Sequence, residues 1–174
     1  MCLALGVPAL GADTVTAVVS TQSLEIDGAP AGAAAYNIDG YNYFKLRDIA
    51  SLLNGTSAQF SVGYDARTNS ITLVTGAAYQ PVGGELSSLG RQTRRGVASP
   101  QSIYINGRQV KDLSVYNVND NNYFKLRDLG NALGFGVDYD AARSTMLITT
   151  PGGAADWDPD ISFTTVDLDG NTWT

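Results

Sequence analysis

The chain has 174 residues, of which 44% are hydrophobic and 16% are charged, a composition typical of one folded domain or two small ones. Its formal net charge of −6 argues against nucleic acid or an anionic membrane surface as a partner. Histidine is absent and Cys2 is the only cysteine, which excludes a Ser-His-Asp triad, a His-ligated copper or zinc site, and an internal disulfide.

The first twelve residues are typical of the end of an export signal. Residues 2–12 form an uncharged apolar run that ends in small residues, as the segment before a signal-peptidase site does. The run is too short to cross a bilayer, which takes about 20 apolar residues. We therefore interpret residues 1–12 as a partial signal peptide. We expect a secreted or cell-surface protein with no membrane insertion after cleavage.

An internal repeat is the strongest pattern in the sequence. Residues 36–48 read YNIDGYNYFKLRD and residues 116–128 read YNVNDNNYFKLRD, with nine of thirteen positions identical. The similarity extends upstream and downstream, so we predict two units at 15–76 and 100–150, joined by a solvated linker at 77–99 that carries Arg91, Arg94 and Arg95. Two copies are too few for a solenoid.

Each copy begins with three predicted strands separated by turns. Alternating apolar residues predict a first strand, and Asp-Gly or Asn-Gly then predicts a hairpin into a second strand. A second turn leads to the strand that contains Asn-Tyr-Phe. In chain order the predicted strands are 24–26, 36–38 and 42–44 in the first copy, and 103–105, 113–118 and 122–124 in the second.

The period then changes to that of a helix. Leu46, Ile49, Ala50 and Leu53 fall on one helical face, as do their counterparts in the second copy, Leu126, Leu129 and Leu133. Gly55 and Gly134 are predicted to end the helices. A final hairpin follows at 60–64 with 71–74, and at 135–139 with 146–149. The predicted fold class is α+β, with two repeats, each a five-stranded antiparallel sheet wrapped around one short helix.

With its doubled NYFKLRD, the region from about residue 24 to residue 150 resembles the copper amine oxidase N-terminal domain family, also called the stalk domain. The resemblance implies a non-catalytic domain of an exported protein, typical of Gram-positive bacteria. In the oxidases, copper and the quinone cofactor belong to a separate domain, so no cofactor or metal is expected here. The family usually has proline before the Leu-Arg step, where this chain has Lys45 and Lys125.

We interpret the repeated motif as structural and assign no catalytic residue. Each aspartate is expected to cap its helix and each arginine to bind a backbone carbonyl. The alternative is that each Arg-Asp pair, with its lysine, forms a fork for a carboxylate or phosphate. The motif residues are Tyr36, Asn37, Tyr43, Phe44, Lys45, Leu46, Arg47 and Asp48 in the first copy, and Tyr116, Asn117, Tyr123, Phe124, Lys125, Leu126, Arg127 and Asp128 in the second.

Six tyrosines recur with the repeat, and two readings of them remain open. Such residues usually fill a small β core, but exposed ones could stack on the sugar rings of a cell-wall glycan. Asp65 and Asp140 follow tyrosine in the last hairpin of each copy, and we interpret them as turn formers rather than as a glycosidase pair. The six tyrosines are Tyr36, Tyr43, Tyr64, Tyr116, Tyr123 and Tyr139.

Residues 151–174 are interpreted as an acidic spacer and the truncated start of a following domain. Residues 163–174 resemble the first strand and turn of a thioredoxin-like redoxin. Asp167, Asp169 and Asn171 have the spacing of a calcium loop, but the glycine and the closing glutamate of an EF-hand are missing.

Three functional hypotheses follow from these patterns. The leading one is a secreted or cell-surface, non-catalytic stalk that acts as a spacer or interaction module. The second is the N-terminal part of an extracytoplasmic thiol-disulfide oxidoreductase that ends before its CxxC. The third is a cell-wall glycan-binding module. The partner is unknown; a cell-wall glycan or another surface protein would fit.

Overall fold

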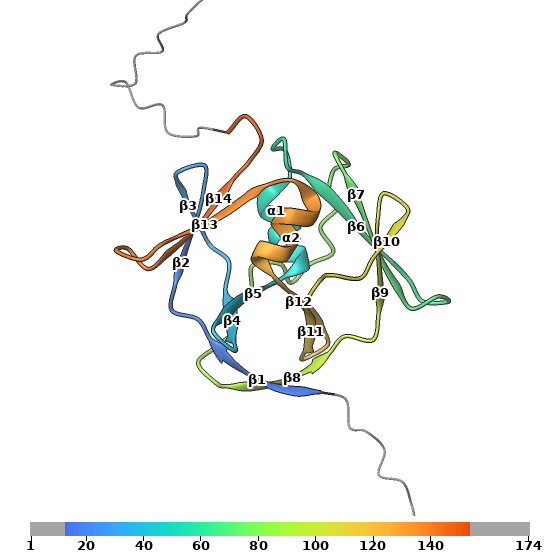
Figure 1. The fold of residues 1–174 in the computed structure, drawn as a ribbon, viewed down its shortest axis with the longest axis horizontal. Helices are drawn as coiled ribbons and strands as arrows, with labels where there is room; N and C mark the ends of the chain where they lie inside the picture. The colour runs from blue at the N-terminus through green and yellow to red at the C-terminus, as the bar shows by residue number, and fades with distance from the viewer. Residues whose placement is uncertain (1–12, 154–174) are drawn as a thin grey trace, which may run out of the picture.

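The computed structural model describes residues 13–153 (Figure 1). The expected signal peptide, the redoxin-like segment and most of the acidic spacer lie outside the described residues. Within residues 13–153, neither helix has the length and the apolar character that crossing a bilayer requires.

Both repeats contain the same succession of elements. The first comprises β1 (Thr14–Val19), β2 (Ser23–Ile26), β3 (Ala29–Ala31), β4 (Ala35–Ile38), β5 (Tyr41–Lys45), α1 (Leu46–Leu53), β6 (Phe60–Asp65) and β7 (Ser70–Thr75). The second comprises β8 (Arg94–Ala98), β9 (Ser102–Ile105), β10 (Arg108–Val110), β11 (Val115–Val118), β12 (Asn121–Lys125), α2 (Leu126–Leu133), β13 (Gly136–Asp140) and β14 (Thr145–Thr149).

Six strands form a closed barrel to which each repeat contributes three. The order around the barrel is β1-β4-β5-β12-β11-β8. Two antiparallel seams join the repeats, one between β1 and β8 and the other between β5 and β12. At the second seam Phe44 lies opposite Phe124, so equivalent residues of the two copies face each other. This pairing shows that an approximate twofold axis relates the repeats.

The remaining strands form two outer sheets in which the repeats exchange hairpins. The β2–β3 hairpin of the first repeat joins β14–β13 of the second, and β9–β10 of the second joins β7–β6 of the first. Each junction is a parallel pair, with Leu24 beside Met146 and Ile71 beside Ile103. Every outer sheet therefore contains one hairpin from each repeat.

The expected fold class, two repeats that each wrap a five-stranded antiparallel sheet around one helix, is therefore wrong. The protein is mostly β, with one shared barrel and two mixed outer sheets. The physical reason is that two copies of one pattern present equivalent strand edges. The edge of β7 can accept a hairpin from either copy, and alternating hydrophobicity does not distinguish them. The prediction located the helix and five of the seven strands of each copy, but it missed β1 and β3 and their counterparts β8 and β10, and it paired the strands within each copy.

Both helices lie between the outer sheets, above the barrel in the view of Figure 1. The predicted helical faces are confirmed, because Leu46, Ile49, Leu126 and Leu129 are buried and Leu53 is fully so. Together with residues of both outer sheets, these side chains form one hydrophobic core. A core shared in this way makes the two repeats a single packing unit.

The barrel interior is a second core, filled by two pairs of tyrosines. Tyr36 packs edge-to-face on Tyr123 with ring centroids 5.0 Å apart, and Tyr43 packs on Tyr116 at 5.4 Å. The pairs are equivalent under the approximate twofold axis. Burial raises the pKa of Tyr123 above its usual value. For Tyr36, Tyr43 and Tyr123, the interpretation as core residues is confirmed.

Candidate functional site

A concave polar surface lies where the repeats meet. It is a crevice of about 240 Å³ between the β5–α1 junction, the outer strands β6 and β7, and the turn from β11 to β12. The lining residues are Lys45, Leu46, Arg47, Val62, Gly63, Tyr64, Ile71, Gln101, Asp120, Asn121 and Asn122. We call this site the crevice.

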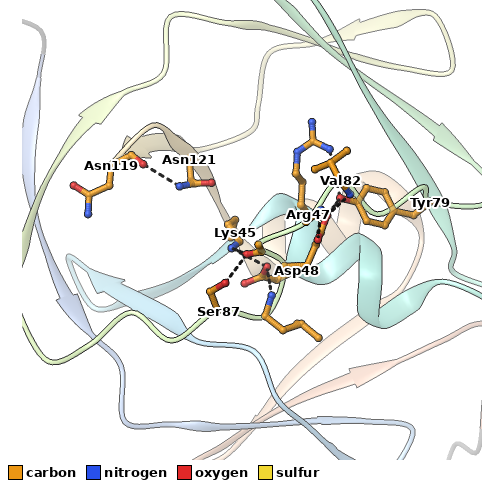
Figure 2. A network of polar contacts seen from close by, with 12 residues as sticks. Lys45, Arg47, Asp48, Tyr79, Val82, Ser87, Asn119 and Asn121 are labelled. Carbon is orange, nitrogen blue, oxygen red and sulfur yellow. Dashed lines mark hydrogen bonds and ion pairs between the residues drawn. The ribbon is translucent and has the colours of Figure 1, made fainter.

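Amide side chains organise one wall of the crevice. The amide of Asn122 donates to Oε1 of Gln101 at 2.6 Å, and the equivalent Asn42 makes the same bond to Gln22 in the other half. Asn121 donates to the backbone oxygen of Asn119 at 2.9 Å, which holds the turn of the hairpin (Figure 2). The bond of Asn121 uses its amide nitrogen, so its carbonyl oxygen can accept a ligand's hydrogen bond.

The other wall carries an aromatic ring and a cation. Tyr64 is 54% exposed, and its hydroxyl donates to Oδ1 of Asn69 at 3.2 Å. Arg47 is half-buried, and Nη1 donates a long bond of 3.4 Å to the hydroxyl of Tyr79 (Figure 2). The crevice thus brings together a flat ring, a guanidinium, several amides and the exposed carboxylate of Asp120. Planar polar groups beside an aromatic face suit a polyhydroxylated ligand.

Lys45 and Asp48 form a buried ion pair below the crevice. Their Nζ and Oδ1 atoms are 3.1 Å apart. Nζ of Lys45 also donates to the backbone oxygen of Gly84 at 2.7 Å, and the amide of Leu86 donates to Asp48 at 2.8 Å (Figure 2). Burial raises the pKa of Asp48 above its usual value. Asp48 makes no side-chain cap to α1, so the expected capping role is replaced by a bond to a distant backbone amide.

Gly84 and Leu86 belong to a segment, residues 77–93, that we call the strap. It lies against α1, and it is held there by Tyr79, which is 1% exposed and whose backbone makes two hydrogen bonds with the side chain of Asn54. Glu85 accepts hydrogen bonds from the Tyr79 hydroxyl and from the backbone amides of Val82 and Gly83. These bonds, and that from Tyr79 most of all, lower the pKa of Glu85 to about 2.

The segment predicted to be a solvated linker is thus the strap followed by β8, a barrel strand. Within the described residues, the buried Nε of Arg94 has no hydrogen-bond partner, while Arg91 and Arg95 are exposed.

The second repeat places the same motif differently. Lys125 and Asp128 are 3.8 Å apart, and each side chain is 22% exposed, against 10% for Lys45 and 2% for Asp48. The ring of Tyr41 lies 3.7 Å from Nζ of Lys125. Asn121 takes the place of Tyr41 in the other copy, so this ring is one difference between the surroundings of the two motifs, and the strap over Lys45 and Asp48 is another. Arg127 is exposed, and neither Arg47 nor Arg127 binds a backbone carbonyl of residues 13–153.

The remaining candidates have structural positions. Oδ1 of Asn37 accepts the amide of Gly40 in the β4–β5 turn, and Asn117 lies opposite Asn122 in the β11–β12 pair. Asp65 accepts the amide of Arg67 at 2.8 Å, and Asp140 accepts that of Ala142 at 2.9 Å, which confirms both as turn formers. No group of three His, Cys, Asp or Glu residues that could hold a metal ion occurs within residues 13–153.

Sequence reasoning missed Gln101, Asp120, Asn121 and Asn122 as a group. The signal that could have found them is the contrast between the two copies, because Gly-Tyr at 40–41 becomes Asp-Asn at 120–121 within an otherwise repeated motif.

Neither a protein-family model, nor a curated protein, nor a solved structure matches this chain.

Proposed function

We propose that the protein is a non-catalytic, extracytoplasmic spacer module in which the two repeats act as one rigid body. The observation that carries this proposal is the exchange of hairpins between the repeats. Because each outer sheet and the barrel need strands from both copies, the repeats have no flexible joint between them. The apolar run at residues 2–12 supports export, and the doubled NYFKLRD supports a stalk-like role.

The path of the chain also suits a spacer. The described chain begins at the barrel, beside β8, and ends on the opposite side of the molecule, beyond the helices (Figure 1). In the outer sheet, β2 and β14 are parallel neighbours. Tension on the two ends would act directly on the C-terminal end of β14, and would reach the N-terminal end of β2 through β1, which β4 and β8 hold in the barrel. Such shear loads all the hydrogen bonds of the pair together, instead of opening them one at a time.

Force spectroscopy on the full chain, with a handle at each end, tests the mechanical part. We expect one unfolding event that releases the length of residues 13–153, roughly 46–51 nm at the extended spacing of the backbone. Two events of about half that length would show that the repeats are independent and would contradict the proposal. Protease treatment of intact producing cells tests the location, since a surface protein is digested while cytoplasmic markers survive.

A second candidate function, glycan binding, is favoured by the crevice. Tyr64, Arg47, Asp120 and Asn121 offer a ring for stacking and hydrogen-bonding groups of both kinds. Titration with soluble cell-wall glycan fragments, followed by NMR, tests it. Asn121→Tyr introduces the residue that the other copy has at Tyr41, and should fill the crevice and abolish binding. Asn131→Tyr adds the same ring on the exposed face of α2 and should leave binding unchanged; equal loss in both variants would refute the site.

A further inference from the structure

We propose that residues 160–162 bind to the first turn of α2 in the way that residues 85–87 of the strap bind to the first turn of α1. The approximate twofold axis carries this inference. Asp48 and the first turn of α1, which receive residues 85–87, have counterparts in Asp128 and the first turn of α2, and the chain that leaves the second half carries a similar triplet at the same distance.

The two chains leave their outer sheets in equivalent ways. At the end of the first repeat, the amide of Thr75 donates to Oδ1 of Asn106 at 3.0 Å, and the Thr75 hydroxyl contacts the same atom. At the end of the second repeat, the amide and hydroxyl of Thr150 donate to Asp27, each at 2.8 Å. Asn106 and Asp27 occupy the same turn of their hairpins. Thr75 and Thr150 are therefore matched starting points.

The sequences after these threonines are similar at residues 85–87 and 160–162. Glu85-Leu86-Ser87 begins ten residues after Thr75, and Asp160-Ile161-Ser162 begins ten residues after Thr150. In each triplet an acidic residue precedes a branched aliphatic residue and a serine. The two triplets therefore follow their matched threonines at the same distance along the chain.

The receiving surface is present on α2 and is only partly used. In the first half, Asp48 accepts the amide of Leu86 at 2.8 Å. Asp128 is the counterpart on α2, and among the described residues its backbone donor is Ser114, at 3.4 Å. Leu53 is fully buried, whereas its counterpart Leu133 is only half-buried. An amide from Ile161 would give Asp128 the partner that Asp48 already has.

Charge and the differences between the halves define the contact further. Arg127 is exposed on α2, and residues 156–160 bring three aspartates. Gly134 stands where the first copy has Asn54, so the second segment lacks the amide that clasps Tyr79. The ring of Tyr41 already lies over Lys125. We therefore assign the contact to Asp128 and Arg127, and expect it to be weaker than the strap. Such docking would set the direction in which the chain leaves the molecule, whether or not the protein is a spacer.

Amide hydrogen exchange on the full chain tests the contact. The amide of Ile161 should exchange about tenfold or more slowly than in an unstructured peptide, as expected for a hydrogen bond to a charged group. Ile161→Pro removes this donor and should abolish the protection of its neighbours, and Asp128→Ala should do the same. Val166→Pro is the matched control and should leave residues 160–162 protected.

The variant Ile161→Gly distinguishes this specific hydrogen bond from non-specific hydrophobic binding of residues 160–162. Leu86 has a positive φ of 57°, which glycine adopts without strain. Ile161→Gly should therefore keep or increase the protection of its own amide, although it removes apolar surface. Exchange of Ile161 at the unstructured rate in the parent protein would overturn the proposal. Protection that rises with protein concentration would place the segment on a second copy and would also overturn it.

Discussion

Phe44 and Phe124 lie directly opposite each other in the antiparallel pair of β5 and β12, and both rings are buried in the core that the repeats share. Equivalent residues that face each other mark the axis about which one repeat is turned onto the other. The Tyr-Phe-Lys part of the repeated motif therefore forms the strand pairing between the two copies.

Shared packing predicts that damage to one repeat unfolds both. Leu46 and Leu126 are 3% and 1% exposed at the start of the two helices. Truncation of either to alanine should lower the free energy of unfolding by about 2–5 kcal/mol, the range for large-to-small changes in a core. Chemical denaturation should still show one transition in each variant. Val82→Ala, at a residue that is 66% exposed, is the control and should unfold like the parent.

Neither repeat should fold alone as a monomer. Residues 13–93 by themselves would leave the β2–β3 and β6–β7 hairpins as separate two-stranded sheets, which are marginal in water. We expect residues 13–93 and residues 94–153 to be unfolded or self-associated when expressed apart, and to form a folded one-to-one complex when mixed. Circular dichroism and light scattering provide the measurement. A well-folded monomer of either half would contradict the exchanged topology.

We expect Gly130→Ala to lower the stability of the protein, although alanine in a helix interior is more stabilising than glycine by about 1 kcal/mol. A Cβ at this position would lie 2.7 Å from a methyl of Val137 and 2.8 Å from the backbone oxygen of Phe135. Relief of this overlap should cost about 1–3 kcal/mol, as overpacking of a core does. This cost equals or exceeds the gain in helix propensity, so we expect the variant to be less stable than the parent. Thermal unfolding measures the effect, with Asn131→Ala, one residue along the exposed face, as the control.

The first copy has Ala50 at the equivalent position, because residues 54–59 separate α1 from β6, whereas α2 is followed almost at once by β13. A gain in stability for Gly130→Ala would show that the chain after α2 can move away from the helix.

Glu85 should make the strap sensitive to acid. The Tyr79 hydroxyl and nearby amides lower the pKa of Glu85 from 4.5 to about 2, so the folded protein binds this proton less readily than the unfolded chain. The resulting stability is complete above pH 4.5 and is lost as the pH falls toward 2. Glu85→Gln should therefore flatten the dependence of the unfolding free energy on pH in this window.

Asp48 works in the opposite direction, because burial raises its pKa and its contribution falls as the pH rises. Burial is the main cause of the raised pKa of Asp48 and is unchanged by Glu85→Gln, so comparison with the parent removes most of this background; loss of the Glu85 charge removes one of the smaller causes. Asp39→Asn introduces the residue that the second copy has at Asn119 and should leave the pH profile in place. An equal change in both variants would mean that general charge, rather than the strap, sets the acid sensitivity.

The local elements could be predicted from the sequence because their causes are local. The spacing of Leu46, Ile49 and Leu53 is sufficient to predict α1, since only a helix brings those side chains to one face. Asp27-Gly28 predicts a turn, and both residues have the positive φ that such a turn requires. The same reasoning succeeds in the second copy, because each of these signals depends on neighbours along the chain.

The candidate site could be predicted only in part. The motif pointed to Lys45, Arg47 and Asp48, but the residues that complete the crevice come from the β11–β12 turn of the other repeat. Residues 77–99 were interpreted as a solvated linker because they carry Arg91, Arg94 and Arg95 in an otherwise acidic chain. The burial of Tyr79 and the bond from Leu86 to Asp48 depend on where α1 lies in the folded chain.

By itself, the sequence determined where both helices and most of the strands and turns lie, and that the chain contains the same unit twice; it did not reveal β1, β3, β8 and β10. Only the tertiary structure decided that each unit completes the other. The strand edges of β7 and β14 are equivalent in pattern, and so are the hairpins β2–β3 and β9–β10 that could cover them. Which hairpin pairs with which edge depends on burying both helices in one core, and that energy belongs to the assembled chain rather than to any segment of it.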